Sequence, residues 1–167
     1  PMMRHIVGRH ARLRISHRLW RQTLAELARR GQASRESGEF LLAAADSDGR
    51  TVTRVVFFDD LDPNCLTGGI SMAGAAFPRL WELCDRESLR VVGDVHTHPT
   101  EWVQQSGTDK ANPMIAQRGH VAVIVPHYAQ RGGNPARFGV HEYLGDAGWR
   151  ANLGRNAKRK LYVGWWA

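Results

Sequence analysis

The sequence predicts a mixed α/β protein, either an α/β or an α+β sandwich, in which a sheet carries helices on both faces. Three observations indicate this class. The chain has 167 residues, of which 43% are hydrophobic, so one domain with a sizeable core can form. Apolar runs of strand length alternate with amphipathic stretches of helical spacing. No repeat or long linker separates them, and we therefore expect a single domain over residues 2–167.

The first half of the chain is expected to hold three strands and two helices. The strands are expected at residues 11–15, 39–45 and 51–58, and the helices at residues 17–30 and about 78–86. Ser16 is a suitable N-cap for the first helix, and Gly31 is expected to end it. A turn at Asp48-Gly49 joins the second and third strands, and composition predicts a loop over residues 59–69.

The second half of the chain is richer in strands. They are expected at residues 89–96, 120–126, 138–144 and 161–165. A short helix is expected near residues 109–117, between the first two of these strands.

The net charge is +7, and arginine supplies most of it. Such a balance fits contact with nucleic acid or with an acidic partner surface, or simply the codon usage of a GC-rich genome. The arginines are scattered along the chain, and we do not expect nucleic acid as a partner. The tightest basic cluster, residues 155–160, is interpreted as a solvated end.

Composition also predicts a cytoplasmic protein without a membrane partner. No apolar run approaches the roughly 20 residues that span a bilayer, and the beginning of the chain lacks the apolar stretch of a secretory signal. The only cysteines are Cys65 and Cys84, so a disulfide framework is not expected.

The stretch GDVHTHPTEWVQQSGTD, residues 93–109, contains the candidate metal ligands. In an extended segment His96 and His98 point to the same side, whereas Thr97 points away. Asp109 follows a Ser-Gly-Thr turn that can return its carboxylate to the same point. Two histidines and one carboxylate form a three-ligand zinc set with an open fourth position, which is typical of a catalytic site.

Other interpretations remain open at this point. A His-x-His pair alone does not establish a metal site, and Asp109 has the properties of an ordinary residue in the first turn of a helix. Asp94 either supports a ligand imidazole from the same face or faces solvent. A zinc hydrolase also needs a general base, for which Glu36, Glu39 and Glu101 are candidates. The remaining histidines are interpreted as surface or core residues.

The order HTHP, six residues, then SGTD resembles the JAMM motif, His-x-His-Pro-x6-Ser-x-x-Asp, of the JAB/MPN metalloprotease family. The upstream run ESGEFLLA, residues 36–43, is similar to the segment that carries the family's glutamate. Glu36 takes the glutamate position, while Glu39 stands where a glycine is usual and remains a rival base. Residues 119–129 and 139–149 also resemble small bacterial JAB proteins.

The resemblance covers most of the chain, and it implies a single JAB/MPN, cytidine deaminase-like domain with a mixed, curved β-sheet flanked by helices. It implies a zinc-dependent isopeptidase or peptidase that cuts after the C-terminal glycine of a ubiquitin-like protein. Relatives are encoded beside ubiquitin-like proteins with their activating and conjugating enzymes, often in antiphage operons. Those proteins and their conjugates are the partners expected here.

The resemblance also implies a role for each site residue. His96, His98 and Asp109 hold Zn²⁺, which acidifies its water and polarises the scissile carbonyl. Glu36 takes a proton from that water and delivers it to the leaving amine. Ser106 donates a hydrogen bond to the oxyanion, and it is also a plausible cap for the helix of Asp109.

Substrate contacts are the least defined part of the prediction. Thr67, Gly68 and Gly69 are candidates for a groove wall that receives an extended tail by strand addition, or form a connection without contacts. Trp102 is a candidate for the substrate channel, with a buried packing tryptophan as the alternative. The pair Trp165 and Trp166 suggests docking on the domain or on a partner.

Three other functions stay open: hydrolysis of sulfur-carrier protein adducts, a non-catalytic MPN scaffold, and a DNA-associated protein like the RadC relatives. The scaffold is disfavoured because this chain keeps the three ligands, a glutamate and the serine. A zinc deaminase is rejected because neither cysteine lies in the Pro-Cys-x-x-Cys pair that this class needs.

Overall fold

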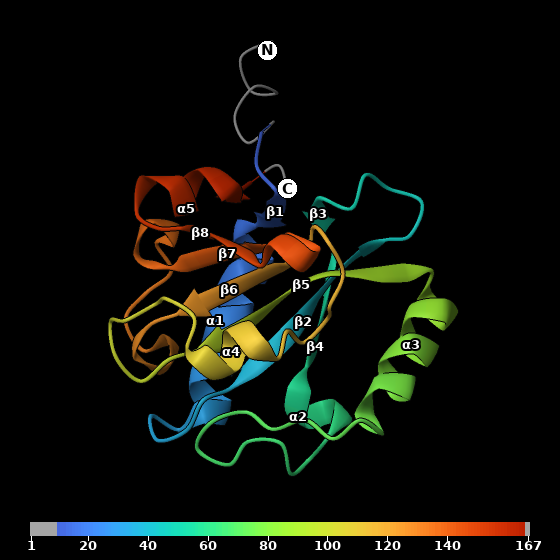
Figure 1. Ribbon diagram of the computed structural model, residues 1–167, viewed down its shortest axis with the longest axis horizontal. Coiled ribbons are helices and arrows are strands. Elements are labelled where there is room, and N and C mark those ends of the chain that lie inside the picture. Colours follow the sequence, from blue (N-terminus) through green and yellow to red (C-terminus); the bar gives the residue numbers. More distant parts are fainter. Residues whose placement is uncertain (1–9, 166–167) are drawn as a thin grey trace.

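The computed structural model describes residues 10–165. Within them, six strands form the main sheet in the order β4-β2-β5-β6-β7-β8 (Figure 1). Their bounds are Arg54–Phe57 (β4), Gly38–Ala44 (β2), Leu89–Thr97 (β5), Val121–Val125 (β6), Gly139–Tyr143 (β7) and Trp149–Asn152 (β8). Neighbours are antiparallel except β5 and β6, which run parallel. The mixed α/β class is confirmed, and this sheet positions the candidate site.

A second, smaller sheet is parallel throughout. It has the order β3-β1-β9, with bounds Thr51–Val52 (β3), Leu13–Ser16 (β1) and Leu161–Gly164 (β9). The expected strand over residues 51–58 is therefore wrong in one respect. The chain leaves the small sheet after Val52 and enters the main sheet at Arg54, so the expected single strand contributes to two sheets.

The helices cover both faces of the main sheet, as expected. Helix α1, His17–Gly31, packs its apolar side on one face, and α3, Ala76–Glu87, packs on the other (Figure 1). Ser16 caps α1 as predicted, since its Oγ accepts from the backbone N–H of Leu19 at 3.2 Å. Gly31 is the last helical residue, and Gln32 supplies the left-handed conformation that ends the helix.

Two hydrophobic clusters correspond to the two faces. The cluster on the α1 face includes Leu41 and Val95 of the sheet, with Leu27 of the helix. The cluster on the α3 face includes Phe40 of the sheet and Leu80 of the helix. Consecutive residues of β2 thus enter different clusters, as the two-residue period of a strand requires.

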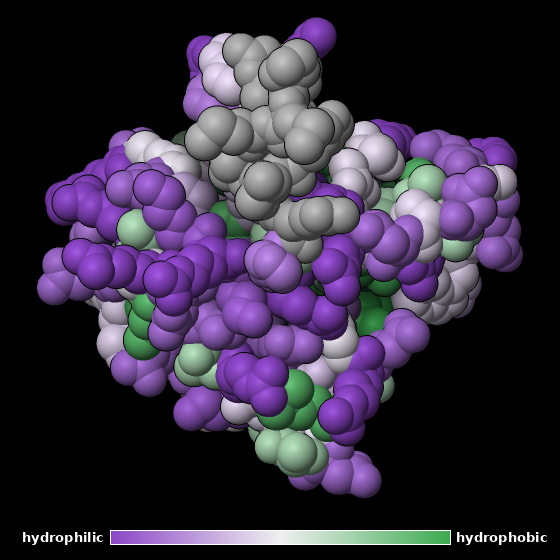
Figure 2. All heavy atoms as spheres, turned by 90° about the horizontal axis from the view of Figure 1, so that it is seen from above, coloured by the Kyte–Doolittle hydropathy of each residue, from purple (hydrophilic) through white to green (hydrophobic). Residues whose placement is uncertain are grey.

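Three further segments differ from the expectation or were not foreseen. Helix α4 covers Gly107–Ala111, so it starts earlier and ends sooner than residues 109–117. Strand β8 and helix α5, Arg155–Lys160, were not predicted. The basic cluster lies on α5 and is mostly exposed, on a face that is largely hydrophilic (Figure 2).

The remaining short elements connect these layers. They are α2, Phe58–Leu61, and three 3-10 turns at His127–Ala129, Pro135–Arg137 and Gly145–Ala147. Trp165 is largely exposed and stacks on His17, with ring centroids 5.2 Å apart, whereas Trp166 lies outside the described residues. No helix in residues 10–165 is long and apolar enough to cross a membrane.

Candidate metal centre

The carboxyl end of β5 presents the two histidines. His96 and His98 are both buried, and their Nε2 atoms lie 3.2 Å apart. Thr97 points to the opposite face, where its Oγ1 accepts from the backbone N–H of Ser37 at 3.0 Å. The two-residue period of the strand therefore produces the convergence that the sequence predicted.

Helix α4 brings the third ligand to this point. Asp109 places Oδ1 3.9 Å from His96 Nε2 and Oδ2 3.6 Å from His98 Nε2. One donor atom from each of the three residues lies within 4.8 Å of the others. Burial opposes the ionisation of Asp109, but the imidazoles and the Ser106 contacts outweigh it, so the pKa of this carboxyl is lowered. The three side chains could hold a metal ion.

The donor set fits zinc. Zinc–ligand bonds of roughly 2.0–2.2 Å place the ligand atoms of a tetrahedron about 3.3–3.6 Å apart, close to the separations seen here. The Nδ1 of His98 lies 2.9 Å from the carbonyl oxygen of Trp102. When Nδ1–H donates to that carbonyl, Nε2 keeps its lone pair free for a metal.

A buried pair supports His96 from behind. Asp94 is 2% exposed, and its Oδ2 lies 2.6 Å from Nε2 of His120. Its Oδ1 lies 3.7 Å from Nδ1 of His96. Burial opposes the ionisation of Asp94, yet His120 and His96 together lower its pKa. The solvent-facing alternative for Asp94 is therefore wrong, and the carboxylate is placed to orient the ligand imidazole.

Glu36 shares a cavity with the candidate ligands. The cavity has a volume of about 410 Å³ and is lined by Glu36, Ile70, Ser71, Met72, Phe77, Asp94, His96, Gln105, Thr108, Asp109, Asn112, Pro113, Met114, Ala122 and Trp149. Partial burial raises the pKa of Glu36, although the charges of His96 and His98 oppose the shift. A carboxyl group here can exchange a proton with a molecule held in the cavity.

Glu39 lies on the other face of the sheet. It pairs in register with Val95, whereas Gly38 pairs with His96. Its side chain is fully buried, and neither oxygen has a hydrogen-bond partner among residues 10–165. Glu39 is thus separated from the cavity by the sheet. Glu101, the third candidate base, is exposed and outside the cavity lining.

Ser106 is the N-cap of α4. Its Oγ accepts from the backbone N–H of Asp109 at 3.1 Å, and Oδ2 of Asp109 accepts from the backbone N–H of Ser106 at 2.7 Å. This reciprocal capping box fixes the carboxylate beside His98. The helix-cap interpretation is therefore confirmed, and Ser106 is not among the residues that line the cavity.

The predicted groove residues lie beside Glu36. Thr67, Gly68 and Gly69 form an exposed turn closed by a bridge between Leu66 and Ile70. The carbonyl of Gly68 accepts from the backbone N–H of Glu36 at 2.7 Å. A side chain at Gly69 would contact Oε2 of the same glutamate. The structure thus brings this turn to the candidate base.

Trp102 lies behind the metal ligands. It is 49% exposed, so the buried packing alternative is wrong. Its ring stacks on that of His98, with centroids 5.7 Å apart and planes 17° from parallel. The ring covers the imidazole and lies outside the cavity lining.

Spacing along the chain did not identify His120 and His141. His120 precedes β6, which pairs with β5 in parallel, so it reaches Asp94 across the sheet. His141 of β7 is buried, and its Nε2 lies 2.9 Å from the carbonyl oxygen of Val103 in the loop before α4. Burial lowers the pKa of His141, and the nearby His96 and His98 act in the same direction. Both contacts join segments that are far apart along the chain, so the spacing of residues could not reveal them.

No model of a known protein family matches the sequence. Among solved structures, the chain is similar to protein DSY2949 from Desulfitobacterium hafniense, with a TM-score of 0.62, 16% identity, and coverage of 90% of this chain and 92% of that one. A protein from Salinibacter ruber matches with a TM-score of 0.53, 19% identity, and coverage of 85% and 90%. Identities this low show a shared fold alone.

A JAB1/MPN domain protein from Archaeoglobus fulgidus, AF2198, also matches, with a TM-score of 0.48, 14% identity, and coverage of 90% of this chain and 96% of that one. This overlap is too loose to carry a conclusion. The fold is therefore shared with the Desulfitobacterium and Salinibacter proteins, and the chemistry depends on the side chains of this chain.

Proposed function

We propose that this protein is a zinc-dependent hydrolase of the JAB/MPN type that cuts a peptide or isopeptide bond after the C-terminal glycine of a ubiquitin-like protein. One observation carries the proposal. His96, His98 and Asp109 bring one donor atom each to a single point, and Glu36 lines the same cavity. This arrangement comes from residues that the His-x-His-Pro-x6-Ser-x-x-Asp spacing and the upstream glutamate had singled out.

Glu36 is the proposed proton carrier. When bound, zinc supplies Lewis acidity, which acidifies water and polarises a carbonyl group. Glu36 accepts the proton of the attacking water and returns it to the leaving nitrogen. Its raised pKa, caused mainly by burial, suits a group that must hold a proton between these steps. Asp94 and the Trp102 carbonyl keep the ligand imidazoles oriented.

An extended, glycine-ended tail is the proposed substrate segment. The turn of Thr67–Gly69 is exposed and adjoins Glu36, and Ile70 continues from it into the cavity lining. A tail laid along this turn by main-chain hydrogen bonds would deliver its last carbonyl to the metal ligands. A glycine at the cleavage point has no side chain that could collide with the turn or with the cavity lining.

Ubiquitin-like proteins, their conjugates and their conjugating enzymes are the proposed partners, in a bacterial antiviral pathway.

Two alternatives use parts of the same site. A sulfur-carrier protein also ends in an extended tail, so its adducts would need the same residues. A non-catalytic scaffold needs no general base, and the half-buried Glu36 beside an intact ligand set favours an enzyme.

The test is cleavage of a ubiquitin-like protein with a short C-terminal extension, followed by intact mass. We expect a single cut after the terminal glycine with zinc-loaded protein, no cut after chelation, and recovery on adding zinc. Replacing that glycine of the substrate by valine should abolish the cut.

Two results would contradict the proposal. One is cleavage that survives chelation. The other is a zinc-loaded protein that leaves extended and isopeptide-linked ubiquitin-like substrates intact. Cleavage of a sulfur-carrier adduct alone would select the alternative substrate.

A further inference from the structure

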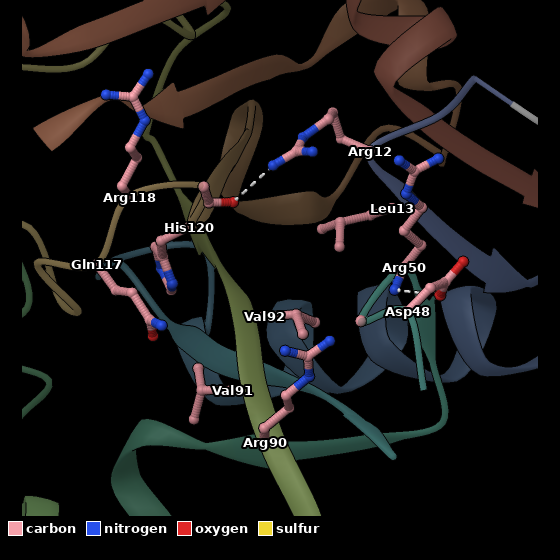
Figure 3. Close-up of a pocket in the computed structure, with 12 residues that line it drawn as sticks. Arg12, Leu13, Asp48, Arg50, Arg90, Val91, Val92, Gln117, Arg118 and His120 are labelled. Carbon is pink, nitrogen blue, oxygen red and sulfur yellow. Dashed lines mark hydrogen bonds between the residues drawn. The ribbon is translucent and has the colours of Figure 1, made fainter. Parts of the chain in front are cut away.

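A second hollow lies at the opposite end of β5 from the candidate metal centre. It has a volume of about 230 Å³, and its lining includes Arg12, Asp48, Arg50, Arg90, Gln117 and Arg118 (Figure 3). We call it the arginine pocket. Arg90 is near the start of β5 and His120 just before β6. Since these strands are parallel, their amino ends meet at this edge, away from His96 and His98.

The arginine pocket concentrates positive charge. Its described lining contains four guanidinium groups and one carboxylate, that of Asp48. Asp48 is already engaged by an arginine outside the lining, since its Oδ2 lies 3.0 Å from a guanidinium nitrogen of Arg14. Such an accumulation is unfavourable unless an anion compensates it.

Two of the four arginines, Arg90 and Arg118, are held by neutral carbonyl groups. Arg90 donates to the carbonyl of Ser47 at 3.0 Å, and Arg118 donates to the carbonyl of Leu144 at 3.4 Å. Arg12 pairs with Glu142 at 3.1 Å, and its buried Nε has no hydrogen-bond partner in the part of the chain that the structure describes. Neutral carbonyls orient two of the groups without cancelling their charge.

Two glycines shape the walls. Gly49 and Gly119 both have positive φ, of 70° and 91°. A Cβ at Gly49 would collide with the guanidinium of Arg90, and one at Gly119 would lie 3.2 Å from that of Arg12. Two of the guanidinium groups, those of Arg90 and Arg12, therefore pack against backbone that carries no side chain.

We propose that the arginine pocket binds the phosphate groups of a small molecule, namely a diphosphate or triphosphate group such as a nucleotide carries. A guanidinium fork matches the oxygens of a phosphate bidentately, so several forks around one hollow select a multiply charged anion. The volume of about 230 Å³ is below that of a typical drug-sized site, so it accommodates the phosphates and leaves a nucleoside outside. This site is independent of the proposed hydrolase activity.

Calorimetric titration of the full chain with pyrophosphate tests the proposal. We expect saturable binding that weakens with added salt, because screening acts on the charges at this exposed rim. Arg90→Ala/Arg118→Ala should lower the affinity by roughly tenfold or more, since each charge-assisted contact counts for about that much. Arg86→Ala/Arg131→Ala, which removes the same charge from exposed positions outside the pocket, should bind as the unaltered protein does.

A second variant guards against a folding defect. Gln117→Glu adds a carboxylate to the lining without removing an arginine, and it should weaken pyrophosphate binding while leaving the unfolding temperature unchanged. Equal binding by both double variants, or equal affinity for sulfate, orthophosphate and pyrophosphate, would overturn the proposal.

The source of the phosphate is tested separately with ATP and with a short single-stranded oligonucleotide. Tighter binding of ATP, lost in Arg90→Ala/Arg118→Ala, supports a nucleotide. ATP binding that depends on Lys158 and Arg159 of α5, and not on Arg90 and Arg118, would overturn the proposal and assign the phosphate contacts to α5. Oligonucleotide binding to α5 without any ATP binding to the pocket would overturn it as well.

Discussion

Glu36 and Glu39 are three residues apart, yet they occupy opposite faces of the main sheet. Glu36 is half-buried in a cavity with His96 and Asp109, where burial raises its pKa against the opposing effect of the imidazoles. Glu39 is fully buried under α1, and burial raises its pKa well above the usual range against the opposing effects of Thr23 and Arg30. The same side-chain chemistry is therefore a candidate catalytic base on one face and a buried core group with a raised pKa on the other.

The register of β2 against β5 produces this difference. Gly38 lies opposite His96, and Glu39 lies opposite Val95. A carboxyl group moved by one residue along β2 would change from one face to the other. The face of the sheet on which each glutamate lies therefore decides its role, and variants that act on one face alone can test this.

The largest effect is expected on the metal face from His98→Ala. The variant loses a ligand and the imidazole that holds Asp109 and Trp102 in place, so bound zinc and cleavage should both fall to background. Zinc content per chain, measured after gel filtration, checks this. His10→Ala is the matched control, because His10 is exposed and lies outside the metal set. Full zinc retention in His98→Ala would contradict the assignment.

Glu36→Gln should have the next largest effect. It keeps the shape of the side chain but cannot carry a proton, so kcat should fall by about 10²- to 10⁴-fold while zinc content and the unfolding temperature stay unchanged. Glu39→Gln makes the same chemical change on the other face and should retain kcat within a factor of a few. If Glu39→Gln lost activity and Glu36→Gln kept it, Glu39 and not Glu36 would be the catalytic base.

Asp94→Asn should have a smaller effect, on metal affinity. Its carboxylate supports His96 and is held by His120, and loss of such a partner typically weakens metal binding about 10- to 100-fold. Competition with a chromophoric chelator measures the zinc affinity directly. Asp85→Asn, on the exposed side of α3, should leave the affinity unchanged. An unaltered affinity in Asp94→Asn would show that His96 needs no support.

Much of the metal face was predictable because it is encoded locally. The two-residue period of the strand points His96 and His98 to the same side. Ser106 and Asp109, three residues apart, cap the same short helix as a reciprocal pair. The split at residues 51–58 was not predictable, because every residue from Thr51 to Phe57 is compatible with one strand and none indicates a change of sheet at Thr53.

The long-range contacts could not be predicted from the sequence, for a different reason. The pair of Asp94 and His120 depends on β6 lying beside β5, and the arginine pocket gathers residues from four separate segments. Spacing along the chain carries no information on such pairings. The sequence likewise offered Glu39 as a base because the face of β2 is fixed only once its partner strand is known.

Glu39→Gln should also change the pH dependence of stability. The folded protein holds a proton on Glu39 at pH values where the unfolded chain, with an ordinary carboxyl pKa near 4.5, has lost it. Stability from this group is therefore complete below the unfolded pKa and declines as the pH rises toward the raised pKa of the folded state. The slope for one proton is about 1.4 kcal/mol per pH unit.

Glutamine cannot titrate, so the difference in free energy of unfolding between the two proteins should shift in favour of Glu39→Gln as the pH rises from about 5 to 8. Urea unfolding of both proteins across this range, without zinc, measures the difference. Glu101→Gln, at an exposed position, should show no such trend. Parallel curves for Glu39→Gln and the unaltered protein would mean that Glu39 is ionised in the fold, which requires a cation beside it on the α1 face. Arg30 is the cation whose charge already acts on this carboxyl, so Arg30→Gln would then be the variant that restores the slope.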